Sequence, residues 1–353
     1  MENLWKNNLR KIEPYVPGEQ SKEQNIVKLN ANENPYPPSP KAIEALNGFN
    51  CGSLRLYPDA NASRLKQALA DYYNVTPKNI FVGNGSDDVI AIAFQSFFNG
   101  KLPIVYPDLT YSFYPVWCSL FNIPYKTYPV GEDFRINPDD YKEDNGGVVI
   151  PNPNAPTSIG EGLDFVEKIM NYNRDSVVII DEAYVDFGGV SSVELTKKYE
   201  NLLVTGTFSK SRSLAGLRLG FAIGSESLIT VMEAVKNSYN SYTVDSLAME
   251  MGTASILDRE YFDSTCKKII ATRERVTKEI RSLGFTVLDS SANFIFATRD
   301  DLSIKDMFEY LKARKVFIRY FSLPRIDNYV RISIGTDEEM DIFLTELRGY
   351  LKK

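Results

Sequence analysis

"VTGTFSKSRSLAGLRLGF" (204–221) places one lysine, Lys210, in a serine-rich turn directly after an apolar run. The run is nearly continuous rather than alternating, as in a strand that is buried on both faces. A loop that ends in Arg218 and Gly220 follows the turn. A lone Ser-Lys pair is typical of a solvated turn, so the rest of the chain decides whether Lys210 has a chemical role.

Short Val- and Ile-rich runs like this one recur between residues 76 and 224, and helix-like stretches separate them. They lie at 79–85, 102–107, 146–153, 176–184, 201–208 and 219–224. Runs of this length and composition are typical of a parallel sheet that helices cover on both faces. The sequence therefore predicts an α/β fold whose large domain has a mostly parallel sheet flanked by helices.

Polar residues gather where these predicted strands end. The clusters are Gly85-Ser86-Asp87, residues 152–157, residues 181–184, and Ser209-Lys210. Ligands of open α/β sheets bind at the carboxyl ends of the strands. We therefore expect these clusters to form one site.

The last third of the chain has a different pattern. A helical stretch from about 244 to 283 precedes strand-like segments at 292–298, 316–321 and 328–335, and a helix closes the chain. This order predicts a smaller α+β domain. We expect an N-terminal arm that is part of the small domain (1–34), a large cofactor-binding domain (35–245) and a C-terminal small domain (246–353).

The composition excludes several kinds of chemistry. The 353 residues include no histidine, so Ser-His-Asp and Cys-His catalysis and histidine-ligated zinc are impossible. We predict no metal site. The formal net charge is −6 and no basic stripe is present, which argues against nucleic acid and membrane surfaces as partners.

Three features indicate a cytoplasmic protein. No apolar run is long enough to span a membrane. The first residues, "MENLWKNNLRKIEPYVPGE", lack the apolar segment of a signal peptide. Cys51, Cys118 and Cys266 lie far apart in no metal-ligand spacing, as expected of free thiols in a reducing compartment.

Lys210 and Asp181 are the residue types that pyridoxal phosphate requires. A lysine amine forms the Schiff base, and a carboxylate keeps the pyridine nitrogen protonated. Asp181 follows "VVII" at a strand end, where a solvated carboxylate is the alternative interpretation. A helix that begins near Ser86 would offer N–H groups to a phosphate, although Ser86 could simply be an N-cap.

Other side chains around these two could complete the site. Thr207, Ser209 and Arg218 flank Lys210 and could bind the phosphate. Tyr111, in "DLTYSFY", could stack on the cofactor ring, although a tyrosine in the hydrophobic core is the commoner role.

Four motifs together resemble a known family. "KLNANENPYPPSPKAI", "VGNGSDD", "VVIIDEAYVDF" and "TGTFSKSRSLAGLRLGF" are similar, in this order, to fold-type-I pyridoxal-phosphate aminotransferases of the class II type, and among them to histidinol-phosphate aminotransferases. The resemblance extends from "IEPYVPGE" to "VRISIGT", which is almost the whole chain.

The resemblance implies a role for each matching residue. Lys210 would bind the cofactor covalently, Asp181 would pair with the pyridine nitrogen, and Tyr184 would bind the ring 3-oxygen. Tyr111 would stack on the ring, and Tyr57 would reach the cofactor phosphate of the partner in a dimer. The other implied cofactor-binding residues are Gly85, Ser86, Asp87, Thr207, Ser209 and Arg218. In "NPNAPTS" (152–158), Ala155 and Ser158 depart from the common N-P-N-N-P-T-G, so Asn154 is carried over as the ring-binding asparagine.

The substrate side of the site depends on two arginines. Arg319 in "VFIRYF" and Arg331 in "YVRISIG" lie in strand-like segments that are mostly apolar. A charge in such a segment needs a partner, either an acidic side chain in a structural salt bridge or an anionic ligand. The resemblance implies that both arginines, with Tyr15 and Asn32, bind the phosphate or carboxylate of the substrate.

The sequence thus predicts a cytoplasmic, homodimeric, pyridoxal-phosphate-dependent aminotransferase with shared active sites. Histidinol phosphate and 2-oxoglutarate or glutamate are its expected substrates, in histidine biosynthesis. Two other enzymes with similar motifs remain alternatives: a decarboxylase of threonine or serine phosphate and a broad aromatic aminotransferase. A non-catalytic regulator with this fold would need a DNA-binding domain, and only about 30 residues precede the first motif.

Overall fold

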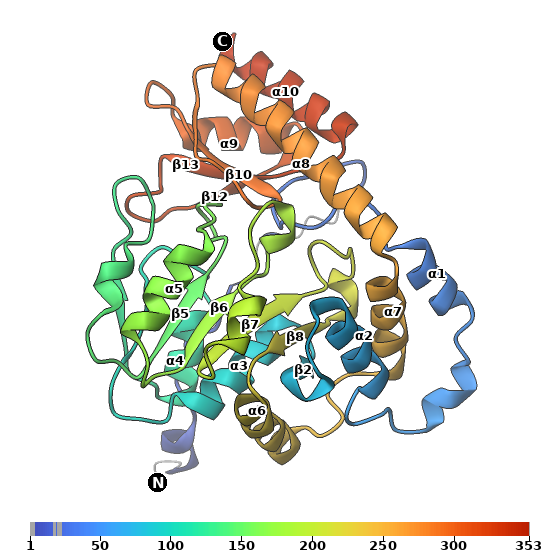
Figure 1. The fold of residues 1–353 in the computed structure, drawn as a ribbon. Helices are drawn as coiled ribbons and strands as arrows, with labels where there is room; N and C mark the ends of the chain where they lie inside the picture. Colours follow the sequence, from blue (N-terminus) through green and yellow to red (C-terminus); the bar gives the residue numbers. More distant parts are fainter. Residues whose placement is uncertain (1–3, 17–18, 20–22, 353) are drawn as a thin grey trace.

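Figure 1 shows the fold in a computed structural model, which describes residues 4–16, 19 and 23–352. Within these residues, a larger body surrounds a seven-stranded sheet and a smaller body surrounds a four-stranded sheet. The long helix α8 (Arg259–Ser282) extends along one side of the molecule from the larger body to the smaller one.

The seven-stranded sheet has the order β2-β8-β7-β6-β5-β3-β4. All of its strand pairs are parallel except those of β8, which runs antiparallel to β2 and β7. The connection 208–219 between β7 and β8 contains one short 3-10 helix and no crossover helix, so β8 returns in the opposite direction. The strands are β2 (Ile80–Gly83), β3 (Ile104–Pro107), β4 (Tyr125–Tyr128), β5 (Gly147–Pro151), β6 (Val178–Asp181), β7 (Leu202–Thr207) and β8 (Gly220–Ile223).

Helices cover both faces of this sheet because its strands are apolar on both sides. Within β6, Val178 and Ile180 point to one face and Ile179 to the other. The first face packs against α2 (Ser63–Tyr73), α5 (Leu163–Tyr172) and α7 (Ser246–Leu257). The second face packs against α3 (Ser86–Phe97), α4 (Tyr114–Phe121) and α6 (Glu226–Tyr239). Helix α1 (Pro40–Asn47) lies against α7.

The smaller body has an antiparallel sheet of order β12-β13-β10-β9, with helices packed on it. Its strands are β9 (Thr286–Val287), β10 (Phe294–Thr298), β12 (Arg319–Tyr320) and β13 (Tyr329–Ser333). Its helices are α8, α9 (Ile304–Ala313) and α10 (Asp337–Leu351). Near the N-terminus, β1 (Val27–Lys28) pairs in parallel with β11 (Val316–Phe317), so the N-terminal segment joins this body.

The predicted fold class is confirmed: an α/β body with a mostly parallel sheet and a smaller α+β body. Three strands, β1, β4 and β9, were not predicted. β1 and β9 are two residues long, and β4, "YKTY", lies at the sheet edge with mostly exposed side chains and lacks the apolar pattern. The division at residues 34 and 245 stays a prediction, and part of the arm lies outside the described residues. Short 3-10 helices occupy Leu4–Asn8, Cys51–Arg55, Pro77–Asn79, Pro138–Tyr141, Val185–Phe187, Val193–Lys197 and Ala215–Leu217.

Among the described residues, none of the helices combines the length and the apolar composition that crossing a membrane requires.

Candidate active site

The carboxyl ends of β5, β6 and β7 border a cavity of about 220 Å³. These three strands are neighbours in the sheet, so residues far apart in the sequence meet at one edge. Of the residues predicted for the site, this cavity is lined by Ser86, Asp87, Tyr111, Asp181, Tyr184, Thr207, Ser209, Lys210 and Arg218.

Lys210 lies three residues beyond β7 and is held through its backbone. The Asn34 side-chain amide donates hydrogen bonds to the carbonyl oxygens of Lys210 (2.9 Å) and Ser211 (3.2 Å). The Lys210 ammonium donates to the Ala31 carbonyl at 3.4 Å. No carboxylate in the described part of the chain forms an ion pair with Lys210. The Lys210 side chain therefore lines the cavity without being held in a salt bridge.

Asp181 is a buried carboxylate at the last position of β6, and 5% of its surface is exposed. Oδ2 accepts a hydrogen bond from the Tyr114 hydroxyl at 2.9 Å, and Oδ1 accepts one from the Thr205 hydroxyl at 3.3 Å. Burial raises the pKa of Asp181 to about 6, while these two hydrogen bonds act in the opposite direction. No described lysine or arginine pairs with it, so a cationic group in the cavity would meet an uncompensated carboxylate.

The N-terminus of α3 closes one end of the cavity. Gly85 is its N-cap residue, with φ of 90°, and contributes no side-chain hydrogen bond, so no cap occupies the first N–H groups of the helix, which is the end of a helix that attracts anions. Ser86 is the first helical residue and not the N-cap. Gly220 lies so close that a Cβ atom there would be 2.4 Å from the Ser86 nitrogen. Only glycine allows this approach of β8 to the loop.

Arg218 and Asp87 lie at the same end of the cavity. The Arg218 guanidinium is 3.0 Å from Asp87 Oδ2 and 3.4 Å from the Ser209 hydroxyl. The other oxygen of Asp87 accepts a hydrogen bond from the Tyr111 hydroxyl at 2.8 Å. A Cβ atom on Gly85 would be 2.6 Å from the Arg218 guanidinium. Asp87 thus contacts both a cation and an aromatic side chain. The guanidinium, the hydroxyl groups and the helix N–H groups at this end of the cavity are the kinds of donor that a phosphate accepts.

A second cavity, of about 230 Å³, adjoins the first. Both are lined by Ala31, Tyr111, Ala155, Tyr184 and Lys210. The second cavity is also lined by the four residues predicted to bind substrate, which are Tyr15, Asn32, Arg319 and Arg331.

Two guanidinium groups face the second cavity from neighbouring strands, since Arg319 and Arg331 are opposite each other in the β12–β13 pair. Arg331 donates to the Asn30 carbonyl at 2.9 Å, and its Nε has no hydrogen-bond partner. Burial lowers the pKa of Arg331, and the charge of Arg319 acts in the same direction. Neither arginine forms an ion pair within the described residues. The alternative that Arg319 and Arg331 form structural salt bridges is therefore wrong for this part of the chain.

Asn32 lines the second cavity and contacts Tyr184, which lines both. Its side-chain amide donates to the Tyr184 hydroxyl at 3.0 Å, and its Oδ1 accepts from the Ser333 hydroxyl at 3.0 Å. The segment that contains Ala31, Asn32 and Asn34 therefore links the four-stranded sheet to the loop of Lys210.

Three predicted residues, Gly85, Asn154 and Tyr57, do not line either cavity, and Gly85 contributes only as the N-cap residue of α3. Asn154 donates to the Leu109 carbonyl at 2.9 Å, and its Oδ1 is buried without a partner. Its neighbour Ala155 is the residue that reaches both cavities. Tyr57 is 81% exposed and stacks on Tyr242, with ring centroids 4.6 Å apart.

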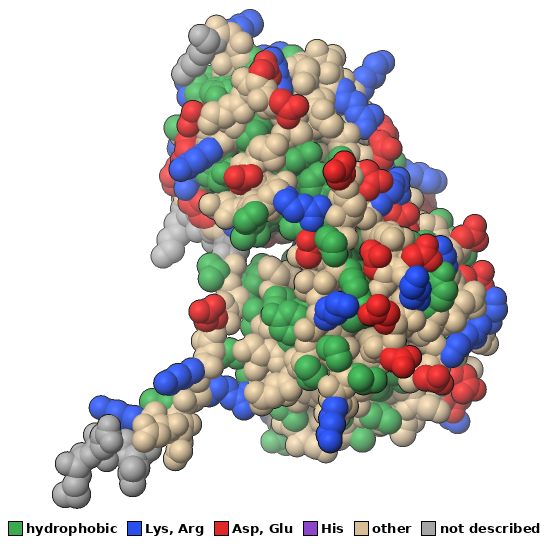
Figure 2. All heavy atoms as spheres, turned by 90° about the vertical axis from the view of Figure 1, so that its left-hand side faces the viewer, with side chains coloured by type: hydrophobic (Ala, Val, Ile, Leu, Met, Phe, Trp, Pro, Cys, Tyr) green, Lys and Arg blue, Asp and Glu red, His purple; other side chains and the backbone are tan. Residues whose placement is uncertain are grey.

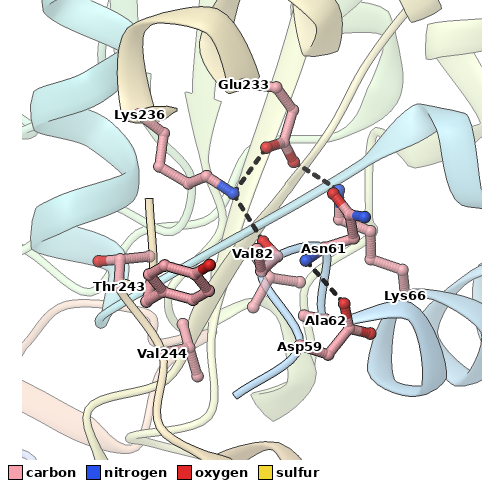
Figure 3. Close-up of a pocket in the computed structure, with 11 residues that line it drawn as sticks. Asp59, Asn61, Ala62, Lys66, Val82, Glu233, Lys236, Thr243 and Val244 are labelled. Atoms are coloured by element: carbon pink, nitrogen blue, oxygen red, sulfur yellow. Dashed lines mark hydrogen bonds and ion pairs between the residues drawn. The ribbon is translucent and has the colours of Figure 1, made fainter. Parts of the chain in front are cut away.

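A small pocket lies beneath the loop that follows Tyr57 (Figure 3). Its volume of about 10 Å³ has room for no more than a water molecule. In Figure 3, Glu233 lies between Lys66 and the buried Lys236, which also donates to the Ala60 carbonyl at 2.9 Å. This cluster holds the loop in place and offers no space for a substrate.

Sequence reasoning missed Tyr114, Thr205 and Asn34. Tyr114 is three residues after Tyr111, and its ring is fully buried. Its local sequence is the same as that of a tyrosine that only fills the hydrophobic core. Asn34 lies in the family motif "KLNANENPYPPSPKAI", and this motif is the signal from which it could have been identified.

Comparison with known proteins gives consistent results. The profile of the family described as aminotransferase class I and II matches residues 24–347. The histidinol-phosphate aminotransferase of Clostridium acetobutylicum is 51% identical over 348 residues, which are 99% of each chain. That of Brachyspira hyodysenteriae is 49% identical over 353 residues, which are 100% of each chain.

One solved structure illustrates the likeness in fold. The histidinol-phosphate aminotransferase of Sinorhizobium meliloti, solved in complex with pyridoxal-5'-phosphate, superposes with a TM-score of 0.83 at 22% identity, covering 92% of each chain.

Proposed function

This chain belongs to the aminotransferase class I and II family and is a pyridoxal-phosphate-dependent aminotransferase, and we propose that it transfers the amino group of histidinol phosphate to 2-oxoglutarate in histidine biosynthesis. The proposal is supported most directly by Arg319 and Arg331. Both face the cavity next to Lys210, and no described acidic side chain pairs with them. An anion of two negative charges uses two guanidinium groups better than a single carboxylate does.

The residues of the first cavity fit the cofactor. Asp181 would pair with the ring nitrogen, because a buried carboxylate without a cationic partner favours a protonated pyridine. Tyr111 would cover one ring face, and Tyr184 would bind the ring oxygen. The phosphate would be held by Arg218, the start of α3 and the hydroxyl groups of Thr207 and Ser209. When bound, the cofactor supplies an electron sink for the bonds at the substrate Cα.

The side chains of this chain then hold and move the proton. Lys210 lies in the wall that the two cavities share, so its amine can take the proton from the substrate Cα. Arg319 and Arg331 would bind the phosphate of histidinol phosphate at the far end of the second cavity. The carboxylates of glutamate and 2-oxoglutarate would use Arg331 in turn.

The assembly is proposed as a homodimer with shared sites. Tyr57 is exposed and lines neither cavity of its own chain, as expected of a residue that reaches the partner's cofactor phosphate. Mixing Tyr57→Phe subunits with Lys210→Ala subunits would give heterodimers with one site that carries both defects and one that carries neither. Full activity of a monomer at any dilution would contradict shared sites. The proposed compartment is the cytoplasm, in agreement with three free cysteines in the described residues.

A panel of amine donors tests the proposed reaction. The purified enzyme, loaded with pyridoxal phosphate, is incubated with 2-oxoglutarate and either histidinol phosphate, an aromatic amino acid or threonine phosphate, and both glutamate formation and carbon dioxide release are measured. We expect glutamate from histidinol phosphate without carbon dioxide. Carbon dioxide from threonine phosphate would indicate the decarboxylase instead, and faster turnover of aromatic amino acids would indicate the broad aromatic aminotransferase.

A further inference from the structure

We propose that Tyr114 is a positioning residue whose phenolic O–H orients the Asp181 carboxylate toward the cofactor ring nitrogen and stabilises its negative charge. This inference rests on the proposed function, because it assigns a role within the same cofactor site. Tyr114 itself lines neither cavity and acts through Asp181.

In the hydrogen bond between Tyr114 and Asp181, the tyrosine is the donor. Tyr114 is the first residue of α4, and its side chain is fully buried. Its hydroxyl lies 2.9 Å from Asp181 Oδ2. Burial raises the pKa of Tyr114 well above its usual value, so the phenol stays protonated and acts as the donor. A hydrogen bond to a charged acceptor is about twice as strong as one between neutral groups.

Tyr114 is the stronger of the two hydroxyl donors to this carboxylate, which also accepts from the Ala183 backbone N–H. Thr205 supplies the second hydroxyl, but its distance to Oδ1 is 3.3 Å. The other titratable or charged side chains around the cavity are Glu33, Asp87, Tyr111, Tyr184, Lys210 and Arg218. Asp87 acts against the ionised form of Asp181, and the two cations form no ion pair with it. The charged form of Asp181 therefore depends on its neutral donors.

The same residue aligns two parts of the cofactor site. The Tyr114 ring is perpendicular to that of Tyr111, with centroids 5.7 Å apart. The hydroxyl of Tyr111 bonds to Asp87, which in turn pairs with Arg218. Tyr114 thus packs against the residue expected on the ring face while it binds the residue expected at the ring nitrogen.

Tyr114→Phe removes the hydroxyl and keeps the ring packing. The matched control is Tyr106→Phe on β3, where the ring is 2% exposed and packs 5.7 Å from Tyr114 at an angle of 69°. The Tyr106 hydroxyl lies beside the Cys118 thiol and has no hydrogen-bond partner among the described residues. Both substitutions delete one buried phenolic oxygen from the same aromatic cluster, so a general packing effect would be common to both.

The experiment measures the dissociation constant of pyridoxal phosphate from the cofactor-free full chain between pH 5 and 8.5, by absorbance of the bound cofactor. In the wild type we expect affinity to fall as the pH drops through about 6, where Asp181 takes up a proton. In Tyr114→Phe the fall should begin at higher pH, because the charged carboxylate has lost a donor. Losing a hydrogen bond to the charged carboxylate would raise the pKa of Asp181 by about one to two pH units, so the affinity at pH 7 should decrease roughly two- to tenfold. Tyr106→Phe should behave as the wild type.

A double-mutant cycle with Asp181→Asn shows whether Tyr114 acts through Asp181. If it does, Tyr114→Phe should cost little affinity in the Asp181→Asn background. Equal pH midpoints in the two Phe variants, or fully additive losses in the cycle, would overturn the inference and leave the proposed function intact. A wild-type chain that binds no pyridoxal phosphate would overturn both.

Discussion

Replacing Arg331 by alanine gives the sharpest test of how the substrate is recognised. The guanidinium lies 5.3 Å from the Phe294 ring centroid and 5.7 Å from that of Phe321, and its Nε has no partner. It is thus a desolvated charge with a donor still available to a ligand. Removing a charged partner from such a site costs about 2–5 kcal/mol, which corresponds to a roughly 30- to 5,000-fold lower kcat/KM.

The assay compares kcat/KM for histidinol phosphate and for glutamate in each variant. Arg331→Ala should lower both values, since both anions would use this residue, and Arg319→Ala should lower the value for histidinol phosphate more than that for glutamate. Arg299→Ala is the control, because Arg299 follows β10 of the same sheet and pairs with the exposed Asp301. A loss of less than about threefold for Arg331→Ala with histidinol phosphate would show that Arg331 does not bind the substrate phosphate.

Three further predictions concern the fold around the site. Glu182 is buried, and burial raises its pKa to about 7. Its contribution to stability is therefore present at low pH and is lost as the pH rises through about 7. Urea unfolding midpoints measured at pH 5.5 and at pH 8 should differ less in Glu182→Gln than in the wild type. Gly220→Ala should weaken cofactor binding, measured by absorbance titration, because its Cβ would displace the loop at Ser86. Asn34→Ala removes two hydrogen bonds to the loop of Lys210 and should lower kcat roughly tenfold without changing the melting temperature by more than a few degrees.

Much of the site could be predicted because a parallel sheet brings its strand ends together. Asp181 and Lys210 were identified from their places after two apolar runs, and both line the same cavity. The two arginines were identified as charges in apolar segments, and they face each other across β12 and β13. In each case the local pattern determined the position, and the strand order then determined the neighbours.

The residues that escaped prediction act through contacts between distant parts of the chain. Tyr114 and Asp181 are 67 positions apart, and Asn34 and Lys210 are 176 apart. A buried tyrosine that donates to a carboxylate has the same local sequence as one that only fills the core. The antiparallel direction of β8 likewise depends on the path of the loop 208–219, which composition does not specify.

The most direct test of the central claim is to reduce the loaded enzyme with borohydride and locate the cofactor by peptide mass spectrometry. We expect one pyridoxyl group per chain, on Lys210, and none in Lys210→Ala. A label on another lysine, or a label that persists at the same level in Lys210→Ala, would contradict this assignment.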